Sequence, residues 1–86
     1  MARVFITAEA LPQIEALPKS VRARVLAIVE RLERWPEVSG AKPLRGALAG
    51  HFRIRTGDYR VQFHPDAAGR VLVVEKVGHR DGFYDD

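Results

Sequence analysis

The sequence predicts an α+β fold in which an N-terminal strand and a two-helix hairpin precede a three-stranded antiparallel meander. In the first part of the chain, apolar residues recur at helical spacing. After Gly50 the period changes to two, and apolar residues alternate with basic ones along two short runs. Gly57 and Asp58 separate these runs and are typical of a two-residue hairpin turn. We therefore expect the helices to pack on one face of a small sheet.

The first helix is expected between Leu11 and Leu17, after a short strand at Arg3 to Ile6. Thr7 follows the strand and can cap the helix. Leu11, Ile14 and Leu17 have helical spacing. Because proline is tolerated in the first turn of a helix but not in its interior, Pro12 is expected either to lie in that turn or to kink a turn that Thr7 caps.

The second helix is predicted more clearly, between Pro18 or Ser20 at its start and Pro36 at its end. Trp35 is expected to be a core residue at the end of this helix. A short linker separates the two helices, so they should pair as an antiparallel hairpin. The apolar stripe of the second helix is formed by Val21, Val25, Ile28, Val29 and Leu32.

The second half of the chain is expected to contain one loop, three strands and a polar tail. Val71 to Val74 is a continuous apolar run, which is typical of a strand buried on both faces. In order, these segments are the loop Glu37–Gly50, the strands His51–Thr56 and Tyr59–His64, the turn Pro65–Gly69, the strand Arg70–Val77 and the tail Gly78–Asp86.

The hairpin turn predicts which residues share a face, because directly opposed residues lie on the same side of a sheet. A one-residue slip would bury arginines, so the pattern specifies the register strongly. The apolar face consists of Phe52, Ile54, Val61 and Phe63. The polar face consists of His51, Arg53, Arg55, Arg60, Gln62 and His64.

The polar face of the hairpin is expected to bind an anion. An ordinary solvated face usually mixes charge signs, but here the only acid between His51 and Pro65 is Asp58, in the turn. Arg55 opposite Arg60 is a like-charge pair, which costs stability unless an anion bridges it. The planar guanidinium group suits phosphate, so this pattern favours a phosphate-bearing partner over simple solvation.

Composition restricts the remaining classes of function. The chain has 86 residues and is expected to form a single domain over 1–86. Its 47% hydrophobic and 29% charged residues are typical of a globular protein, and no apolar run is long enough to span a membrane. The absence of cysteine excludes disulfides and thiolate ligands and is compatible with a cytoplasmic location. The three histidines lack ligand spacing and no glycine-rich phosphate loop precedes a helix, so we expect no metal, cofactor or small-molecule ligand.

Two segments, Lys42 to Phe63 and Val77 to Tyr84, resemble the core of the RelE/ParE toxin superfamily, most specifically its RelE-like members. The most specific parts of the resemblance are Gly57-Asp-Tyr-Arg60 and Gly78-His-Arg80. It implies a toxin of a type II toxin–antitoxin system, with two helices on one sheet face and a basic site on the other. It also implies three partners: a cognate antitoxin, the ribosome and messenger RNA.

The same resemblance implies a ribosome-dependent endonuclease that cuts messenger RNA without a metal. In RelE-like toxins the 2′-OH of the cleaved strand attacks the adjacent phosphate and leaves a cyclic phosphate. Such a reaction needs a base, cations on the phosphate and an acid. By position in the family's motifs, Arg60 and Arg80 would hold the phosphate, and Tyr84 would stack on a base or handle a proton.

Arg53 and Arg55 fall where RelE-type enzymes carry lysines, and they would orient the RNA. Because arginine stays protonated, it cannot replace lysine as a general base. His79, beside Arg80, is the first candidate for the base, and the alternatives are His51, His64 and Glu75. Further RNA contacts are expected from Lys42, Arg45 and His51.

Two other functions remain open on this scaffold. A ParE-like toxin would poison DNA gyrase by protein–protein contact without any nuclease activity. A catalytically inactive relative would bind only RNA or an antitoxin. The Gly78-His-Arg80 motif followed by Phe83-Tyr84 resembles the nucleases more closely.

Overall fold

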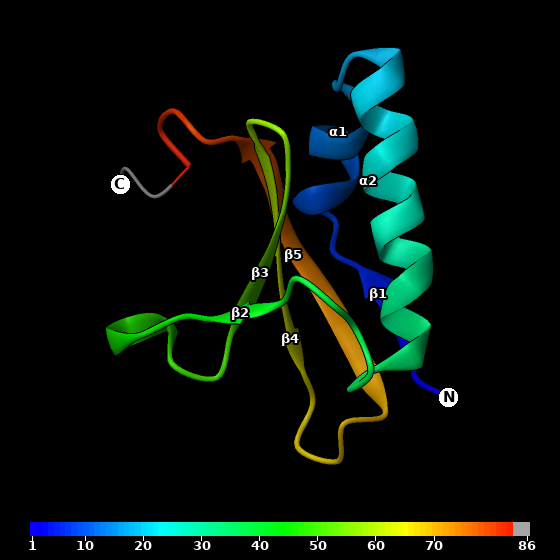
Figure 1. Ribbon diagram of the computed structural model, residues 1–86, viewed down its shortest axis with the longest axis vertical. Coiled ribbons are helices and arrows are strands. Elements are labelled where there is room, and N and C mark those ends of the chain that lie inside the picture. The colour runs from blue at the N-terminus through cyan, green and yellow to red at the C-terminus, as the bar shows by residue number, and fades with distance from the viewer. Residues whose placement is uncertain (84–86) are drawn as a thin grey trace.

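The computed structural model describes residues 1–83. Its five-stranded sheet has the order β1-β5-β4-β3-β2. Both α-helices lie on one side of this sheet (Figure 1), so the α+β class and the helix layer are as predicted. The elements are β1 (Arg3–Ile6), α1 (Ala10–Glu15), α2 (Lys19–Arg31), the 3-10 turn η1 (Leu32–Arg34), β2 (Lys42–Pro43), the 3-10 turn η2 (Gly46–Leu48), β3 (Phe52–Thr56), β4 (Tyr59–Pro65) and β5 (Val71–His79).

The two helices begin where the local sequence favours a helix start. The backbone N–H of Ala10 donates to Thr7 Oγ1 over 3.0 Å, so Thr7 caps α1 as expected. Pro12 lies in the first turn of α1, where it breaks no intrahelical hydrogen bond. α2 starts directly after Pro18, and its last turn tightens into η1 before the chain turns away at Trp35.

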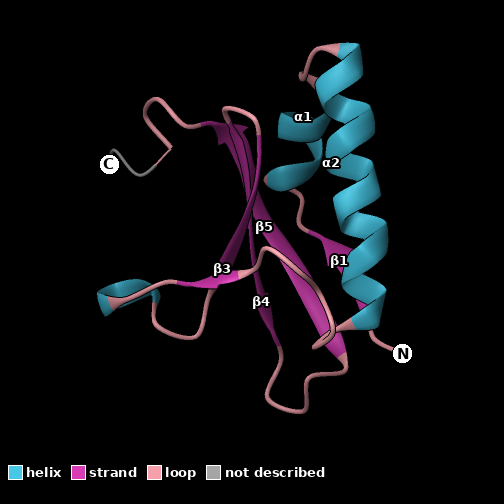
Figure 2. Cartoon of the chain, in the orientation of Figure 1, coloured by secondary structure: helices cyan, strands magenta, loops and turns pink. Residues whose placement is uncertain are grey.

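The strands are more extensive than the sequence predicted. β1 pairs in parallel with β5, with Val4 opposite Leu72, so the sheet is mixed. β2 lies within the segment expected to be a loop and pairs with β3. Figure 2 shows that the chain after β2 projects away from the helices. β5 continues to His79, so Gly78 and His79 belong to this strand and not to a tail.

The register of the β3–β4 hairpin is the one predicted. Its pairs run from Phe52 opposite Phe63 to Thr56 opposite Tyr59. Gly57 in the turn has a φ of +58°, a conformation that L side chains rarely adopt. The hairpin therefore presents its apolar residues on one face and its basic residues on the other.

The core fills the space between the helices and one sheet face. Trp35 packs edge-on against Phe52 and Phe63, with ring centroids 4.8 and 5.5 Å apart, which confirms it as a core residue at the end of the helix. The residues of this core with no more than 4% exposure are Ala10, Ile14, Val25, Ile28, Leu32, Ile54, Val61, Phe63, Leu72, Val74 and Val77.

β5 is buried on only one face for most of its length. Leu72 and Val74 are fully buried, whereas Val71 and Val73 are partly exposed. Phe5, opposite Val73 on β1, is 57% exposed. The expectation that Val71 to Val74 is buried on both faces was therefore wrong, because α1 and α2 cover only one side.

Within residues 1–83, no helix combines the length and the apolar character that crossing a bilayer requires.

Replacing Phe63 by alanine should lower the free energy of unfolding by about 3–5 kcal/mol, because it leaves a cavity beneath the helices. Chemical denaturation followed by circular dichroism would measure the change. Arg55→Ala is the matched control on the opposite face, and we expect it to change stability by no more than about 0.5 kcal/mol. Equal losses for both variants would contradict this assignment of the two faces.

Candidate nucleic-acid interface

The face of the sheet turned away from α1 and α2, here called the open face, carries two rows of paired residues. Strand pairing places Lys42, Arg53, Gln62 and Lys76 side by side across β2, β3, β4 and β5. The neighbouring row consists of Arg55, Arg60 and Gly78. The predicted cationic face therefore exists, and β2 and β5 widen it with a lysine each.

Among residues 1–83, no acidic side chain neutralises the arginines of the open face. Within residues 1–83, the side chains of Arg53, Arg55 and Arg60 have no hydrogen-bond or ion-pair partner. Arg55 lies directly opposite Arg60, so two like charges face each other across the strands. Such a pair costs stability, and an anion between the two groups would relieve the repulsion. The arrangement is chemically suited to holding a phosphate.

Lys76 is a cation of this face that the sequence analysis missed. Its Nζ lies 4.6 Å from the centroid of the Phe83 ring and donates a hydrogen bond to the Phe83 carbonyl oxygen. The Phe83 ring also lies against Gly78, 3.5 Å from where a Cβ atom would stand, and the side chain is buried. The segment after β5 thus folds back over the part of the open face next to Arg60.

A β-bulge brings Glu75 to the two histidines of the hairpin. Gln62 pairs with Lys76 and Phe63 pairs with Val74, so Glu75 is the extra residue of the bulge. Its carboxylate lies 2.5 Å from His51 Nδ1 and 3.2 Å from His64 Nδ1. The ring centroids of His51 and His64 are 4.8 Å apart. These three residues are called the His–Glu cluster below.

The Glu75 carboxyl is held in its ionised form. Partial burial alone would raise its pKa, but hydrogen bonds from His51 and from Gln62 Nε2 (3.1 Å) oppose this effect. Together with the attraction of His51 and His64 they outweigh it, so the pKa of Glu75 lies below its ordinary value. Glu75 does not lie opposite Arg60, which pairs with Gly78.

His79 lies on the other side of the sheet from Arg60. It pairs with Tyr59, whose ring it meets edge-on with centroids 5.2 Å apart. Its Nδ1 accepts a hydrogen bond of 3.1 Å from the backbone of Asp81. Because β5 extends through this position, alternation turns His79 away from the face that holds the arginines. The geometry therefore does not support the expectation that His79 works beside Arg60.

Arg80 lies at the end of β5, beside the turn of the hairpin. Its backbone N–H donates to the Asp58 carbonyl over 2.7 Å, which extends the strand pairing by one step beyond His79. Its guanidinium lies 3.9 Å from Asp58 and 3.8 Å from Asp81 and is 58% exposed. Ion pairs this long and exposed contribute little to stability, so the side chain can reorient toward a ligand.

Two further expected residues lie near the edge of the sheet, and one cannot be placed. Lys42 is an exposed residue of the first row, and Arg45 is exposed just before η2. Tyr84 lies outside the described residues.

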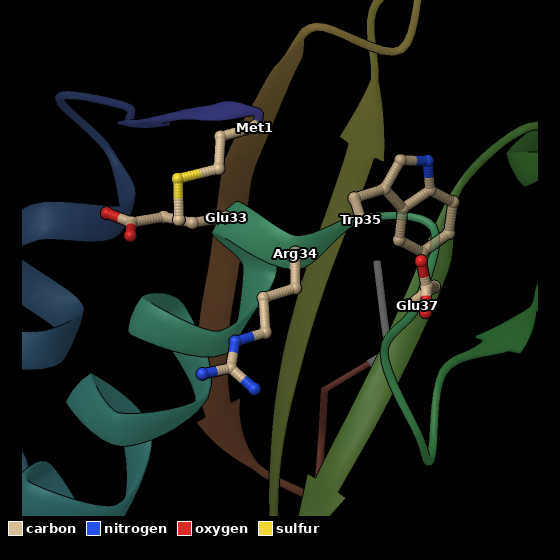
Figure 3. A pocket seen from close by; sticks show the side chains of 5 residues that line it. All are labelled: Met1, Glu33, Arg34, Trp35 and Glu37. Carbon is tan, nitrogen blue, oxygen red and sulfur yellow. The ribbon is translucent and has the colours of Figure 1, made fainter.

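A hollow beside η1, lined by Met1, Glu33, Arg34, Trp35 and Glu37, shares no residue with the two rows (Figure 3).

The chain is similar over nearly its whole length to known toxins. The family described as the ParE toxin of the type II toxin–antitoxin system, parDE, matches residues 4–82. The Toxin RelG of Mycobacterium tuberculosis is 35% identical over 82 residues, which cover 94% of this chain and 93% of that protein.

Solved structures of toxins are also similar to this chain over most of its length. The toxin–antitoxin complex RelBE2 from Mycobacterium tuberculosis contains a chain that matches with a TM-score of 0.79 and 34% identity, covering 92% of this chain and 98% of that one. The isolated RelE toxin of E. coli matches with a TM-score of 0.77 over 92% of this chain and 84% of that one. At 20% identity, the second match bears on the fold alone.

Glu75→Gln should lower the free energy of unfolding at neutral pH by about 1.5–3 kcal/mol, the range for a hydrogen bond to a charged group. A carboxyl whose pKa is lower in the folded state stabilises the fold above its unfolded pKa, which is near 4.5. The difference from wild type should therefore shrink as the pH falls below that value. Urea denaturation at a series of pH values would test this, and a constant difference would contradict it.

Proposed function

We propose that this chain, which belongs to the ParE-type toxins of type II toxin–antitoxin systems within the RelE/ParE superfamily, is an endoribonuclease. Its substrate is messenger RNA on the ribosome, and it acts in the cytoplasm. Cleavage of that RNA stops translation.

The observation that carries this proposal is the pair Arg55 and Arg60, with Arg53 in the next row. These guanidinium groups face the solvent side of a rigid sheet and have no acidic partner among the described residues. A polymer of phosphates would supply the missing anions at a regular spacing. Preorganised cations of this kind stabilise the charge that develops on a phosphate during transfer.

The proposed reaction is internal attack by the RNA itself. The 2′-OH oxygen forms a bond to the adjacent phosphorus while the bond from phosphorus to the 5′ oxygen breaks. The products are a 2′,3′-cyclic phosphate and a 5′-OH. The proton of the 2′-OH leaves to a base, and the 5′ oxygen receives a proton. Arg60 and Arg80 hold the phosphate, and Arg53, Arg55, Lys42 and Arg45 position the strand.

Proton transfer has to involve a side chain other than arginine. Of the four groups considered from sequence, His51, His64 and Glu75 lie on the open face, and His51, just before β3, precedes Arg53 by two positions. His79 lies on the opposite side, so we assign it a structural role at the end of β5.

We also propose a cognate antitoxin as the stable partner. The RelBE2 structure to which this chain is similar is a toxin–antitoxin complex. A segment with acidic side chains would neutralise the arginines of the open face. A domain of this size buries a limited fraction of its surface, so such a partner would also add stability.

Two alternatives use the same scaffold. The description of the matching family names the ParE toxin, and this supports gyrase poisoning as the second candidate function. That activity works through protein contact and does not require unpaired arginines on a sheet face. An inactive relative that only binds RNA or an antitoxin would keep the arginines but show no cleavage.

Replacing Arg60 and Arg80 together by alanine should reduce ribosome-dependent cleavage of a defined messenger by at least about 10²–10³-fold, the effect typical of losing one preorganised donor. The fold should stay intact, because neither side chain belongs to the core. Cleavage is followed by primer extension and folding by circular dichroism.

Arg34→Ala is the control for this loss of positive charge, because Arg34 is an exposed arginine of η1 outside the two rows. It should retain cleavage close to that of wild type. A folded Arg60→Ala/Arg80→Ala variant that cleaves as well as Arg34→Ala would contradict the nuclease assignment of the open face.

Induced expression of the chain without a partner should stop protein synthesis before DNA synthesis. The reason is that the proposed substrate is translated RNA, and replication fails only later as a consequence. Pulse labelling with an amino acid and with thymidine measures the order. Early loss of DNA synthesis, with gyrase–DNA complexes accumulating, would instead support the ParE-like alternative.

A further inference from the structure

The His–Glu cluster gathers three potential metal ligands on the open face. One ligand atom from each of His51, His64 and Glu75 lies within 4.8 Å of the others. No such site was expected from the sequence, because the three residues are far apart in the chain. The hairpin brings the histidines together, and the bulge adds the carboxylate. We propose that this cluster binds a transition-metal ion of the Zn²⁺ type.

The kinds of ligand favour such an ion. Two imidazoles and one carboxylate form the ligand set of zinc sites that keep one position open to water. Imidazole nitrogen suits Zn²⁺, Co²⁺ and Cu²⁺, whereas Mg²⁺ and Ca²⁺ prefer sites made entirely of oxygen. The cluster therefore selects against the divalent ions that usually accompany RNA.

The ligand atoms all lie within 4.8 Å of one another, a separation that side-chain rotation can reduce to what the ion needs. Ligands about 2.0–2.1 Å from a tetrahedral Zn²⁺ stand roughly 3.3 Å from one another. The carboxylate of Glu75 lies 2.5 Å from His51 Nδ1 and 3.2 Å from His64 Nδ1. A metal ion would replace the hydrogen bonds that these atoms now share, once rotation of the side chains brings the ligands together.

The surroundings hold the ligands in place while leaving them accessible. Gln62 is buried, and its Nε2 donates to Glu75 Oε1 over 3.1 Å, a contact of the kind that orients metal-binding carboxylates. The exposed fractions of the His51, His64 and Glu75 side chains are 27%, 34% and 21%, so an ion can reach them from solvent.

Direct binding tests this inference independently of any nuclease activity. Zn²⁺ is titrated into the full chain, purified without a polyhistidine tag, by calorimetry against a chelator of known affinity. We expect one Zn²⁺ per chain and a melting temperature that rises with Zn²⁺ concentration through binding linkage. Co²⁺ at the same site should give the visible absorption of a low-symmetry, four-coordinate ion.

Two ligand variants and one matched control decide the outcome. His51→Ala and Glu75→Gln should each weaken Zn²⁺ binding at least about 10–100-fold, the loss measured even for outer contacts of metal sites. Glu75→Gln preserves the side-chain shape, so it remains informative if His51→Ala does not fold. His79→Ala removes a histidine that lies outside the cluster, paired with Asp81, and should leave the affinity unchanged.

Three results would overturn the inference. The first is the absence of saturable Zn²⁺ binding by the wild-type chain. The second is wild-type affinity in a folded Glu75→Gln or His51→Ala variant. The third is Mg²⁺ binding at this site as tight as that of Zn²⁺, which would contradict the selectivity expected from two imidazole ligands.

Discussion

Ile54, Val61 and Phe63 pack from the β3–β4 hairpin into the interior beneath the helices, and the arrangement of the open face depends on that packing. A shift of the strands by one residue would expose all three side chains and bury arginines, which is energetically prohibitive. The hydrophobic side of the hairpin therefore holds Arg55 opposite Arg60 despite their repulsion. Burial on one face stabilises an electrostatic arrangement on the other that would not form by itself.

The same constraint explains the bulge in β5. Val74 and Val77 are both buried although they are three positions apart, and regular alternation would put them on opposite faces. The extra residue of β5, Glu75, lies opposite the step from Gln62 to Phe63; it resolves this conflict and leaves Glu75 and Lys76 for the open face. A core requirement thus creates both the His–Glu cluster and the additional cation of the first row.

The sequence predicted what local patterns determine and missed what depends on contacts between distant segments. The hairpin register follows from the alternation between Phe52 and Phe63 and was confirmed. The parallel pairing of Val4 with Leu72, by contrast, has no local signal. His79 was expected in a tail beside the arginines. Because β5 extends through His79, the alternation of side chains along the strand places it on the face opposite the arginines. The spacing of Val74 and Val77 was the available sign of the bulge, and it becomes interpretable only once both are known to face the core.

The arginines of the open face also indicate how the proposed activity would be controlled. Arg53, Arg55 and Arg60 can be neutralised by the phosphates of RNA or by the carboxylates of an antitoxin, but not by both at once. Either anion relieves the same repulsion, so the two partners compete for one source of binding free energy. Under the proposed function, inhibition then requires no change of fold, because an acidic segment that covers the open face excludes the substrate directly. Loss of that segment would return the toxin to an already assembled phosphate-binding surface.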